Sequence, residues 1–427
     1  MQALRIYAGP LAREHVARHG LAPAHVATIP GAAGGPKGLI LGPLDRFIFG
    51  EWLPQSQQPV DLVGASIGAW RMATACLDDP AAAFKTLERD YIAQHYELRP
   101  GQKRPAAGFV SEQFAGNLER FYGGRMGEVL GHPRYRLHVL TSRGRHVLGR
   151  EGPWRTPVGY LGAFLTNTAQ RRAMGAWLER VVFSSGAGRD AAVEMSRVSG
   201  LGSLGGLPAL PFGTGDFRTR QVALTEANFK LAIQASCSIP FVLKAVHDIP
   251  GAPRGAYWDG GIIDYHLHLD YLLNKSTSHL LANSLVTARP DGNKDLTEFE
   301  KTTNSQAPTA KDQANDAAGE VAAGQASLVL YPHFQKAVVP GWLDKGLKWR
   351  HKATRHLDHM LLLAPSPEWV KTLPNAKLPD RNDFVHYGND FAGRKTAWNS
   401  VVSASQQIAD EFAAWLEKPD MARVLPI

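Results

Sequence analysis

Short apolar runs alternate along the chain with longer stretches in which apolar side chains recur at helical spacing. Residues 26–29 and 60–63 are strand-like runs, and each leads through glycines into a helix-like stretch, residues 39–49 and 67–77 respectively. Two successive strand–loop–helix units predict a parallel sheet in which both loops lie at the same edge. Ligands bind at that edge in such sheets, so the two loops can meet around one substrate.

The remaining pattern continues this alternation of helices and strands. Helices are expected at residues 11–20, 81–122 and 225–236, and strands at residues 135–141, 181–185 and 327–331. Residues 342–363 are expected to be mostly helical, and residues 387–416 to contain an amphipathic helix that packs on the sheet. Residues 151–215, rich in glycine, proline, arginine and aromatic side chains, fit either a lid over the site or long surface connections.

The composition changes between residues 274 and 326, where polar residues and alanine dominate and no hydrophobic period is sustained. Such a tract predicts a polar, flexible insertion. We therefore expect a core of residues 1–273 with lid-like elaborations at about residues 150–215. The insertion follows, and a C-terminal region, residues 327–427, supplies a strand and helices that pack on the core.

The totals describe a globular protein with a sizeable core, since 44% of the 427 residues are hydrophobic and 20% are charged. The net charge of +8 favours approach to anionic surfaces, including peripheral contact with a membrane, but no nucleic-acid motif accompanies it. The two cysteines, Cys76 and Cys237, fit a reducing compartment. No signal peptide and no apolar run of about 18 residues is found, so a cytoplasmic protein is expected.

Candidate chemistry gathers at the two predicted loops. Gly64-Ala-Ser66-Ile-Gly68 is a G-x-S-x-G pattern between a strand and a helix, where a sharp turn lifts the serine hydroxyl clear of the sheet. Residues 30–38 place backbone N–H groups at a helix N-terminus, which suits a phosphate or a developing oxyanion. This loop is not a P-loop, because Gly38 follows Lys37, and it lacks the G-x-G-x-x-G fingerprint. An oxyanion hole or a plain turn remains.

A third loop, Tyr257-Trp-Asp259-Gly-Gly261, holds an aspartate in a glycine turn. It can place a carboxylate against another loop, or it can be a plain Asp-Gly hairpin turn.

Together these motifs resemble the patatin-like phospholipase family over about residues 25–265. The matching segments, in order along the chain, are Gly34-Gly-Pro-Lys-Gly38, Gly64-Ala-Ser66-Ile-Gly68, Ala235-Ser236 with Pro240, and Asp259-Gly-Gly261. The resemblance implies a three-layer α/β/α fold with a mainly parallel sheet and a lipid acyl hydrolase of the phospholipase A type. It implies no metal and no organic cofactor.

The resemblance also assigns roles to individual residues. Ser66 would be the nucleophile and Asp259 the group that accepts its proton, so a serine–aspartate dyad replaces a triad. The N–H groups of the glycine-rich loop would hold the oxyanion, and further glycines would shape the three loops; these are Gly34, Gly35 and Lys37 for the oxyanion and Gly38, Gly64, Gly68, Gly260 and Gly261 for the loops. Ala33 stands where the family often has another glycine, and Pro36 has no N–H to donate.

Two alternatives stay open. In a Ser-His-Asp α/β-hydrolase the base would be a histidine after the acid, and the candidates are His266, His268, His333, His351, His356, His359 and His386. The chain could also be a non-catalytic binding protein on a patatin-like fold. The sequence does not separate phospholipid from neutral-lipid or short-chain esters as substrates, and it does not give the oligomeric state.

Overall fold

The computed structural model describes residues 1–96, 105–186, 207–271 and 327–427. The predicted polar insertion, residues 274–326, lies outside these residues, and so does part of the expected lid, residues 187–206.

One eleven-stranded sheet runs through the described part of the chain. Its main path has the order β11-β1-β10-β9-β2-β3-β4-β5-β6, and β7 and β8 join it beside β4. The strands of this path are β1 (Leu4–Ala8), β2 (Val26–Gly31), β3 (Val60–Ala65), β4 (Tyr135–Gly144), β5 (Leu178–Ser184), β6 (Thr219–Ala223), β9 (Leu328–Pro332), β10 (Met360–Pro365) and β11 (Val424–Pro426). The five central strands β10, β9, β2, β3 and β4 run parallel to one another, whereas β1 pairs antiparallel with β10 and β5 pairs antiparallel with β4. The fold is therefore α/β with a largely parallel sheet, as predicted.

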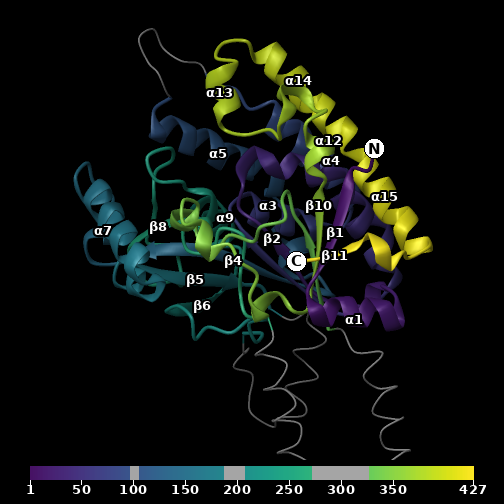
Figure 1. The fold of residues 1–427 in the computed structure, drawn as a ribbon. Coiled ribbons are helices and arrows are strands. Elements are labelled where there is room, and N and C mark those ends of the chain that lie inside the picture. Colours follow the sequence, from purple (N-terminus) through teal and green to yellow (C-terminus); the bar gives the residue numbers. More distant parts are fainter. Residues whose placement is uncertain (97–104, 187–206, 272–326) are drawn as a thin grey trace, which may run out of the picture.

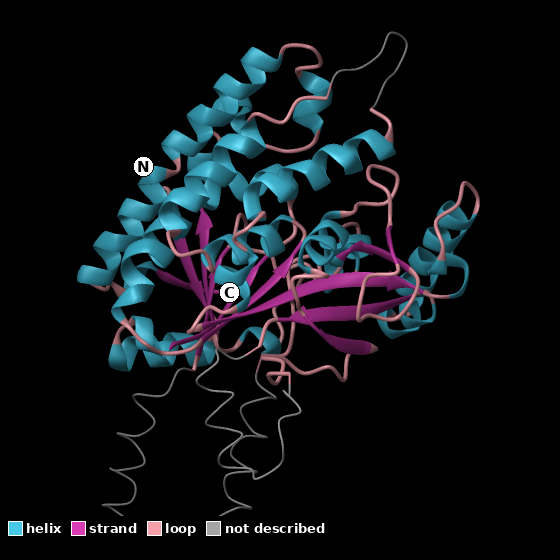
Figure 2. Cartoon of the chain, turned by 180° about the vertical axis from the view of Figure 1, so that it is seen from behind, coloured by secondary structure: helices cyan, strands magenta, loops and turns pink. Residues whose placement is uncertain are grey.

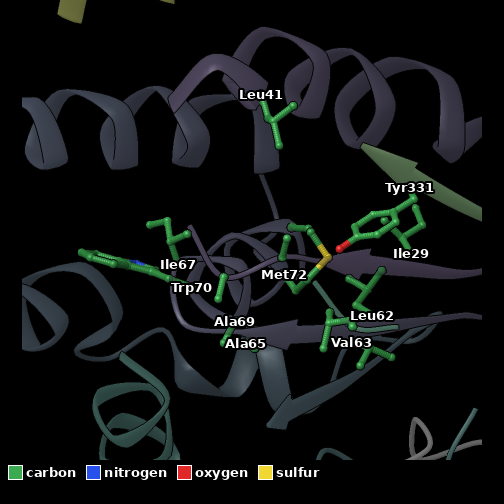
Figure 3. Packing of buried hydrophobic residues seen from close by; sticks show 14 of the residues in the cluster. Ile29, Leu41, Leu62, Val63, Ala65, Ile67, Ala69, Trp70, Met72 and Tyr331 are labelled. Atoms are coloured by element: carbon green, nitrogen blue, oxygen red, sulfur yellow. The ribbon is translucent and has the colours of Figure 1, made fainter. Parts of the chain in front are cut away.

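The centre of the sheet is buried on both faces. Every residue of β3, β9 and β10 is buried, as expected for parallel strands covered on both sides. Helices cover the strands, and Figure 2 shows a thick helical layer on one side of the sheet. Close to the strands, Met72 of α3 (Ile67–Ala75) lies beside Ile29 of β2 and Leu62 of β3 (Figure 3).

The helical layer in Figures 1 and 2 includes α4 (Pro80–Ile92), α5 (Ala107–Tyr122), α14 (Phe391–Ala404) and α15 (Gln406–Glu417), and α2 (Gly42–Phe47) packs against α4 and α15. Helix α15 is amphipathic, and its buried residues Ile408, Phe412 and Trp415 follow helical spacing. The ring of Phe412 packs edge-on against Phe47 of α2. The predicted amphipathic C-terminal helix is thus confirmed.

Most predicted elements occur with shifted ends. The helix expected at residues 11–20 is α1 (Pro10–His19), and the one expected at residues 225–236 is α9 (Phe229–Cys237). The strand expected at residues 181–185 is β5. Within the span expected to be a lid or surface connections, α7 (Arg155–Ala169) forms a separate helix at one end of the molecule (Figure 1).

The expectation of a mostly helical stretch at residues 342–363 is wrong. Three short 3-10 turns, Trp342–Asp344, Lys348–Arg350 and Arg355–Leu357, precede strand β10. Strand β10 has the sequence Met360-Leu-Leu-Leu-Ala-Pro365, a continuous apolar run at the end of the stretch expected to be helical. Periodicity cannot distinguish such a fully buried strand from a buried helix.

The C-terminal segment completes the sheet of the N-terminal segment. Strands β9 and β10 lie between β1 and β2, and β11 pairs with β1 at the edge. Residues on both sides of the predicted insertion therefore share one core.

Away from the centre, a buried arginine connects two segments. Arg180 of β5 makes two hydrogen bonds of 2.7 Å to the carboxylate of Asp264 and two of 3.0 Å to that of Asp216. Its side chain is fully buried.

Candidate active site

Strand β4 brings Ser66 and Asp259 together, although 193 positions separate them in sequence. The first half of β4 pairs with β3, so that Ala65 lies opposite Leu140. The next residue of β4, Thr141, lies opposite Asp259, the last residue of β8 (Ala256–Asp259). The serine that follows β3 and the aspartate that ends β8 therefore meet beside adjacent residues of one strand.

The two side chains are hydrogen-bonded. Ser66 Oγ donates to Asp259 Oδ2 at 2.7 Å, and both residues are buried, with exposed fractions of 3% and 5%. Ser66 has φ 57° and ψ −131°, a backbone conformation that is costly for a residue with a Cβ. A strained turn between strand and helix is the expected geometry of the nucleophile in a G-x-S-x-G loop.

Ser236, at the end of α9, holds this turn in place. Its Oγ accepts a hydrogen bond from the Ser66 N–H at 2.9 Å and donates to the carbonyl oxygen of Leu140 at 2.7 Å. The hydroxyl thus connects the turn at Ser66 to β4. The sequence pattern marked Ser236 only as part of a motif, and its contacts explain why a small hydroxyl side chain stands there.

Close backbone contacts explain two of the motif glycines. A Cβ on Gly68 would lie 1.8 Å from the carbonyl oxygen of Gly31, and a Cβ on Gly260 would lie 2.1 Å from that of Leu140. Neither carbonyl can move without shifting its strand. Side chains at these two positions would force apart the end of β2, the turn at Ser66 and the turn after Asp259.

Burial controls the charge of Asp259. Desolvation raises the pKa of its carboxyl group from the ordinary 3.8 to about 6, although hydrogen bonds from Ser66 and from the Gly261 N–H, together with nearby Arg381, favour the ionised form. The Gly261 N–H donates to Oδ1 at 2.7 Å, which leaves Oδ2 for the serine. The carboxylate is therefore held in one orientation and is a stronger base than an exposed aspartate.

The glycine-rich loop after β2 lies beside the dyad. A 3-10 helix, Gly35–Leu41, begins in this loop, and the loop is fixed by a hydrogen bond of 2.9 Å from the Ala33 N–H to the carbonyl oxygen of Tyr265. Gly34 and Lys37 line the same cavity as Ser66 and Asp259, whereas Gly35 is not among the lining residues. The first N–H groups of a helical turn have no partner within the turn and can bind an anion.

The cavity in front of Ser66 has a volume of about 200 Å3. Its inner wall consists of the dyad and the glycine-rich loop, and Ile239, Pro240 and Ile262 add apolar surface. The outer wall comes from the C-terminal segment and comprises Trp342, Lys345, Asp380, Arg381 and Asn382.

No protein-family model and no curated protein matches the chain.

Three cationic side chains face this cavity. Lys37 is half-buried, and its ammonium lies 5.3 Å from the ring centre of Phe334. Lys345 is exposed, with its ammonium 4.1 Å from the ring centre of Tyr265, and Arg381 is exposed beside them. Among the described residues, none of the three forms an ion pair within 4.0 Å with a carboxylate. An anionic group bound in front of Ser66 would meet unneutralised positive charge.

The acidic residue at the mouth of the cavity is already paired. Asp380 Oδ1 lies 2.9 Å from Lys377 Nζ, so its charge is offset locally. Burial lowers the pKa of Lys37, although Asp380 acts in the opposite direction. The outer wall of the cavity, with Lys345 and Arg381 against one paired carboxylate, therefore carries more positive than negative charge.

None of the seven candidate histidines lines the cavity of Ser66. His266 hydrogen-bonds the backbone at Ala337 and Val339, and burial lowers its pKa well below the ordinary value. Burial likewise lowers the pKa of His333 to about 3 and that of His268 to about 4. The group that contacts the serine hydroxyl is the Asp259 carboxylate.

Two absences hold for the part of the chain that the structure describes. It contains no group of three or more histidine, cysteine or carboxylate side chains arranged to hold a metal ion. None of its helices combines the length and the apolar character needed to cross a membrane. Cys76 and Cys237 are both free and buried.

The sequence motifs do not predict the residues that form the outer wall of the cavity. Trp342, Lys345 and Arg381 lie in short turns without a recognisable motif, in a region expected to be helical or left unassigned. The signal present in the sequence is the cluster of basic residues from Lys345 to Arg355, which fits an anion-binding surface and a solvated helix face equally well.

Proposed function

We propose that this protein is a serine esterase that hydrolyses lipid acyl esters, with a dyad of the kind found in patatin-like phospholipases. The observation that carries the proposal is the 2.7 Å hydrogen bond from Ser66 Oγ to Asp259 Oδ2 at the wall of a cavity. A serine hydroxyl is a weak nucleophile and needs an adjacent base. The hydrogen bond supplies that base without a histidine.

In the proposed reaction, Ser66 Oγ attacks the carbonyl carbon of the ester while its proton passes to Asp259 Oδ2. N–H groups of the loop containing Gly34 and Lys37 would stabilise the negative oxygen. Collapse of the intermediate expels the alcohol, which takes the proton from Asp259 and leaves an acyl-serine. A water molecule then gives its proton to Asp259 and attacks the acyl carbon, and the departing serine oxygen recovers the proton as the carboxylic acid is released.

The charge state of Asp259 supports this role. With its pKa raised to about 6, the carboxyl group is mostly ionised near neutral pH and can still accept a proton readily. A general base works best when its pKa lies near the working pH, because it is then both free and basic.

Lipid substrates are proposed from the motifs and from the character of the cavity. Ile239, Pro240 and Trp342 provide apolar surface beside the serine, and the cationic rim suits an ester that carries a phosphate or carboxylate. Phospholipids have both properties, which also fits peripheral contact with an anionic membrane.

The first experiment is covalent labelling with a fluorophosphonate probe, followed by mass spectrometry of the labelled peptide. We expect the peptide containing Ser66 to be labelled in the native protein and not in Ser66→Ala. The matched control is Ser142→Ala, because Ser142 is a buried serine on β4 that does not line the cavity. Absence of labelling at Ser66 in the folded native protein would favour a non-catalytic binding protein.

A second experiment separates the dyad from a histidine triad. Hydrolysis of acyl esters of increasing chain length and of phospholipid vesicles should be lost in Asp259→Asn and retained in His266→Gln and His333→Gln. Loss of activity in a single folded histidine variant, with Asp259→Asn still active, would overturn the dyad.

A further inference from the structure

Helix α7 presents an apolar face to solvent. Trp154, Val158, Leu161 and Leu165 follow one another at intervals of four, three and four positions, which places them in one line along the helix. Their exposed fractions are 61%, 52%, 59% and 59%, and Phe164 beside them is 41% exposed. Figure 1 shows α7 at the end of the molecule, away from the helical layer that covers the sheet.

Helix α7 has a single charged residue, Arg155 at its first position, whereas a solvated helix face normally carries several. Between Glu151 and Glu179 the sequence contains three arginines and no carboxylate. A contiguous exposed apolar surface of this kind marks an interaction site more often than an ordinary solvated helix.

The opposite face of α7 is anchored close to the candidate active site. Tyr160 packs edge-on against Trp258, the residue before Asp259, with ring centres 5.9 Å apart. Asn167 Nδ2 donates a 2.8 Å hydrogen bond to Asp344, in the turn that also contains Trp342 of the cavity wall. The exposed stripe is therefore the outer side of a well-packed helix.

Phe241 places a further exposed apolar side chain between the anchored face of α7 and the cavity. Its ring lies 6.1 Å from that of Tyr160, and its side chain is 58% exposed. It follows Pro240, which lines the cavity, and it has a φ of 67°, an unusual conformation for a bulky residue. The strained turn thus displays an aromatic ring to solvent directly beside the site.

A basic cluster adjoins the helix. It lines an open hollow of about 460 Å3 and consists of Arg143, Arg145, Arg150, Arg218, Arg220 and Arg254. Glu179 lies within ion-pair distance of three of these arginines, and Asp248 binds Arg150 at 2.9 Å. The arginines thus exceed the carboxylates that pair with them. Leu148, within the same segment, lies against Gly159 of α7 and joins the cluster to the helix.

We propose that α7 and this basic cluster form a docking surface for an anionic phospholipid bilayer. The apolar stripe would lie at the boundary of headgroups and acyl chains, and the arginines would face the lipid phosphates. A bilayer fits this surface because the six arginines outnumber the two carboxylates paired with them, and lipid phosphates supply the matching negative charge. The inference goes beyond the proposed hydrolysis and does not require it.

The test measures binding without catalysis, using full-length Ser66→Ala and co-sedimentation with vesicles. Vesicles of equal parts phosphatidylcholine and phosphatidylserine should retain the protein, and vesicles of phosphatidylcholine alone or high salt should weaken retention. Adding Leu161→Glu should lower the partition coefficient about tenfold or more, because it removes apolar burial and adds a repelled charge. The matched control is Leu11→Glu, which places the same change on the exposed side of α1 and should bind as the parent does.

Circular dichroism and thermal unfolding establish that both glutamate variants are folded. Equal loss of binding in Leu11→Glu and Leu161→Glu, or retention independent of phosphatidylserine, would overturn the proposal. So would a dimer in solution that Leu161→Glu dissociates while vesicle binding persists, since the stripe would then be a subunit interface. If the Ser66→Ala protein fails to bind vesicles but Ser66 of the native protein is still labelled by the fluorophosphonate probe, the docking proposal fails and the esterase proposal stands.

Discussion

Replacing Asp259 by asparagine should abolish hydrolysis and at the same time stabilise the fold. Burial raises the pKa of this carboxyl group from 3.8 to about 6, so the ionised group is less favourable in the folded protein than in the unfolded chain. A rise of this size corresponds to ~3 kcal/mol at neutral pH. Asparagine has the same shape, and its oxygen can accept from the Gly261 N–H while its amide faces Ser66 Oγ.

The dependence on pH distinguishes this cause from a general packing effect. Because the pKa in the folded protein lies above that in the unfolded chain, the penalty is absent below about pH 4, grows up to about pH 6 and is complete above it. Asp259→Asn should therefore exceed the native protein in unfolding free energy by up to ~3 kcal/mol at about pH 8, which is roughly 3 °C in Tm for a chain of this length. The two proteins should converge near pH 4.

The assay is urea unfolding followed by tryptophan fluorescence, repeated across this range of pH. The control is Asp248→Asn, since hydrogen bonds from Gly255 and Arg150 lower the pKa of that exposed carboxyl group, and its loss should not stabilise the fold. If Asp259→Asn is no more stable than the native protein at alkaline pH, or if its gain does not change with pH, the raised pKa is refuted.

Three further measurements test the site and the fold. Below about pH 6, kcat/KM should fall about tenfold per pH unit as Asp259 is protonated, and a plateau that continues well below this pH would exclude Asp259 as the base. Arg180→Ala leaves Asp216 without its ion-pair partner and Asp264 with only Arg171, 3.8 Å away, and should cost ~3–5 kcal/mol in urea unfolding; an unchanged midpoint would contradict that role. Lys345→Gln and Arg381→Gln should each raise KM for a phosphate-bearing ester roughly two- to fivefold more than for a neutral ester of equal chain length, and equal effects on both esters would contradict anion recognition.

The two central strand–loop–helix units could be predicted from the sequence because their turns depend only on neighbouring residues. The glycines around Ser66 and after β2 mark sharp turns between a strand and a helix, and such turns depend on neighbouring residues alone. The structure places β2 and β3 side by side in parallel, with Gly31 opposite Gly64, so the two predicted loops share one edge of the sheet.

The position of Asp259 depends on long-range pairing that no local pattern encodes. It reaches Ser66 because β8 pairs with the second half of β4, and the sequence pattern ended that strand at residue 141. The outer wall of the cavity escaped prediction for a related reason. Lys345 and Arg381 approach the site only because β9 and β10 insert between β1 and β2, and the buried run of β10 looks helical in sequence.

The two walls of the cavity differ in how freely they can vary. On the inner wall, backbone touches backbone at Gly68 and Gly31, so the turn at Ser66 and the glycine-rich loop form a rigid unit that tolerates few substitutions. The outer wall consists of side chains on short turns, and several of them, such as Lys345 and Arg381, are exposed. Under the proposed function, reaction chemistry and substrate preference depend on separate parts of the chain, so substrate preference should be open to redesign through the C-terminal turns alone.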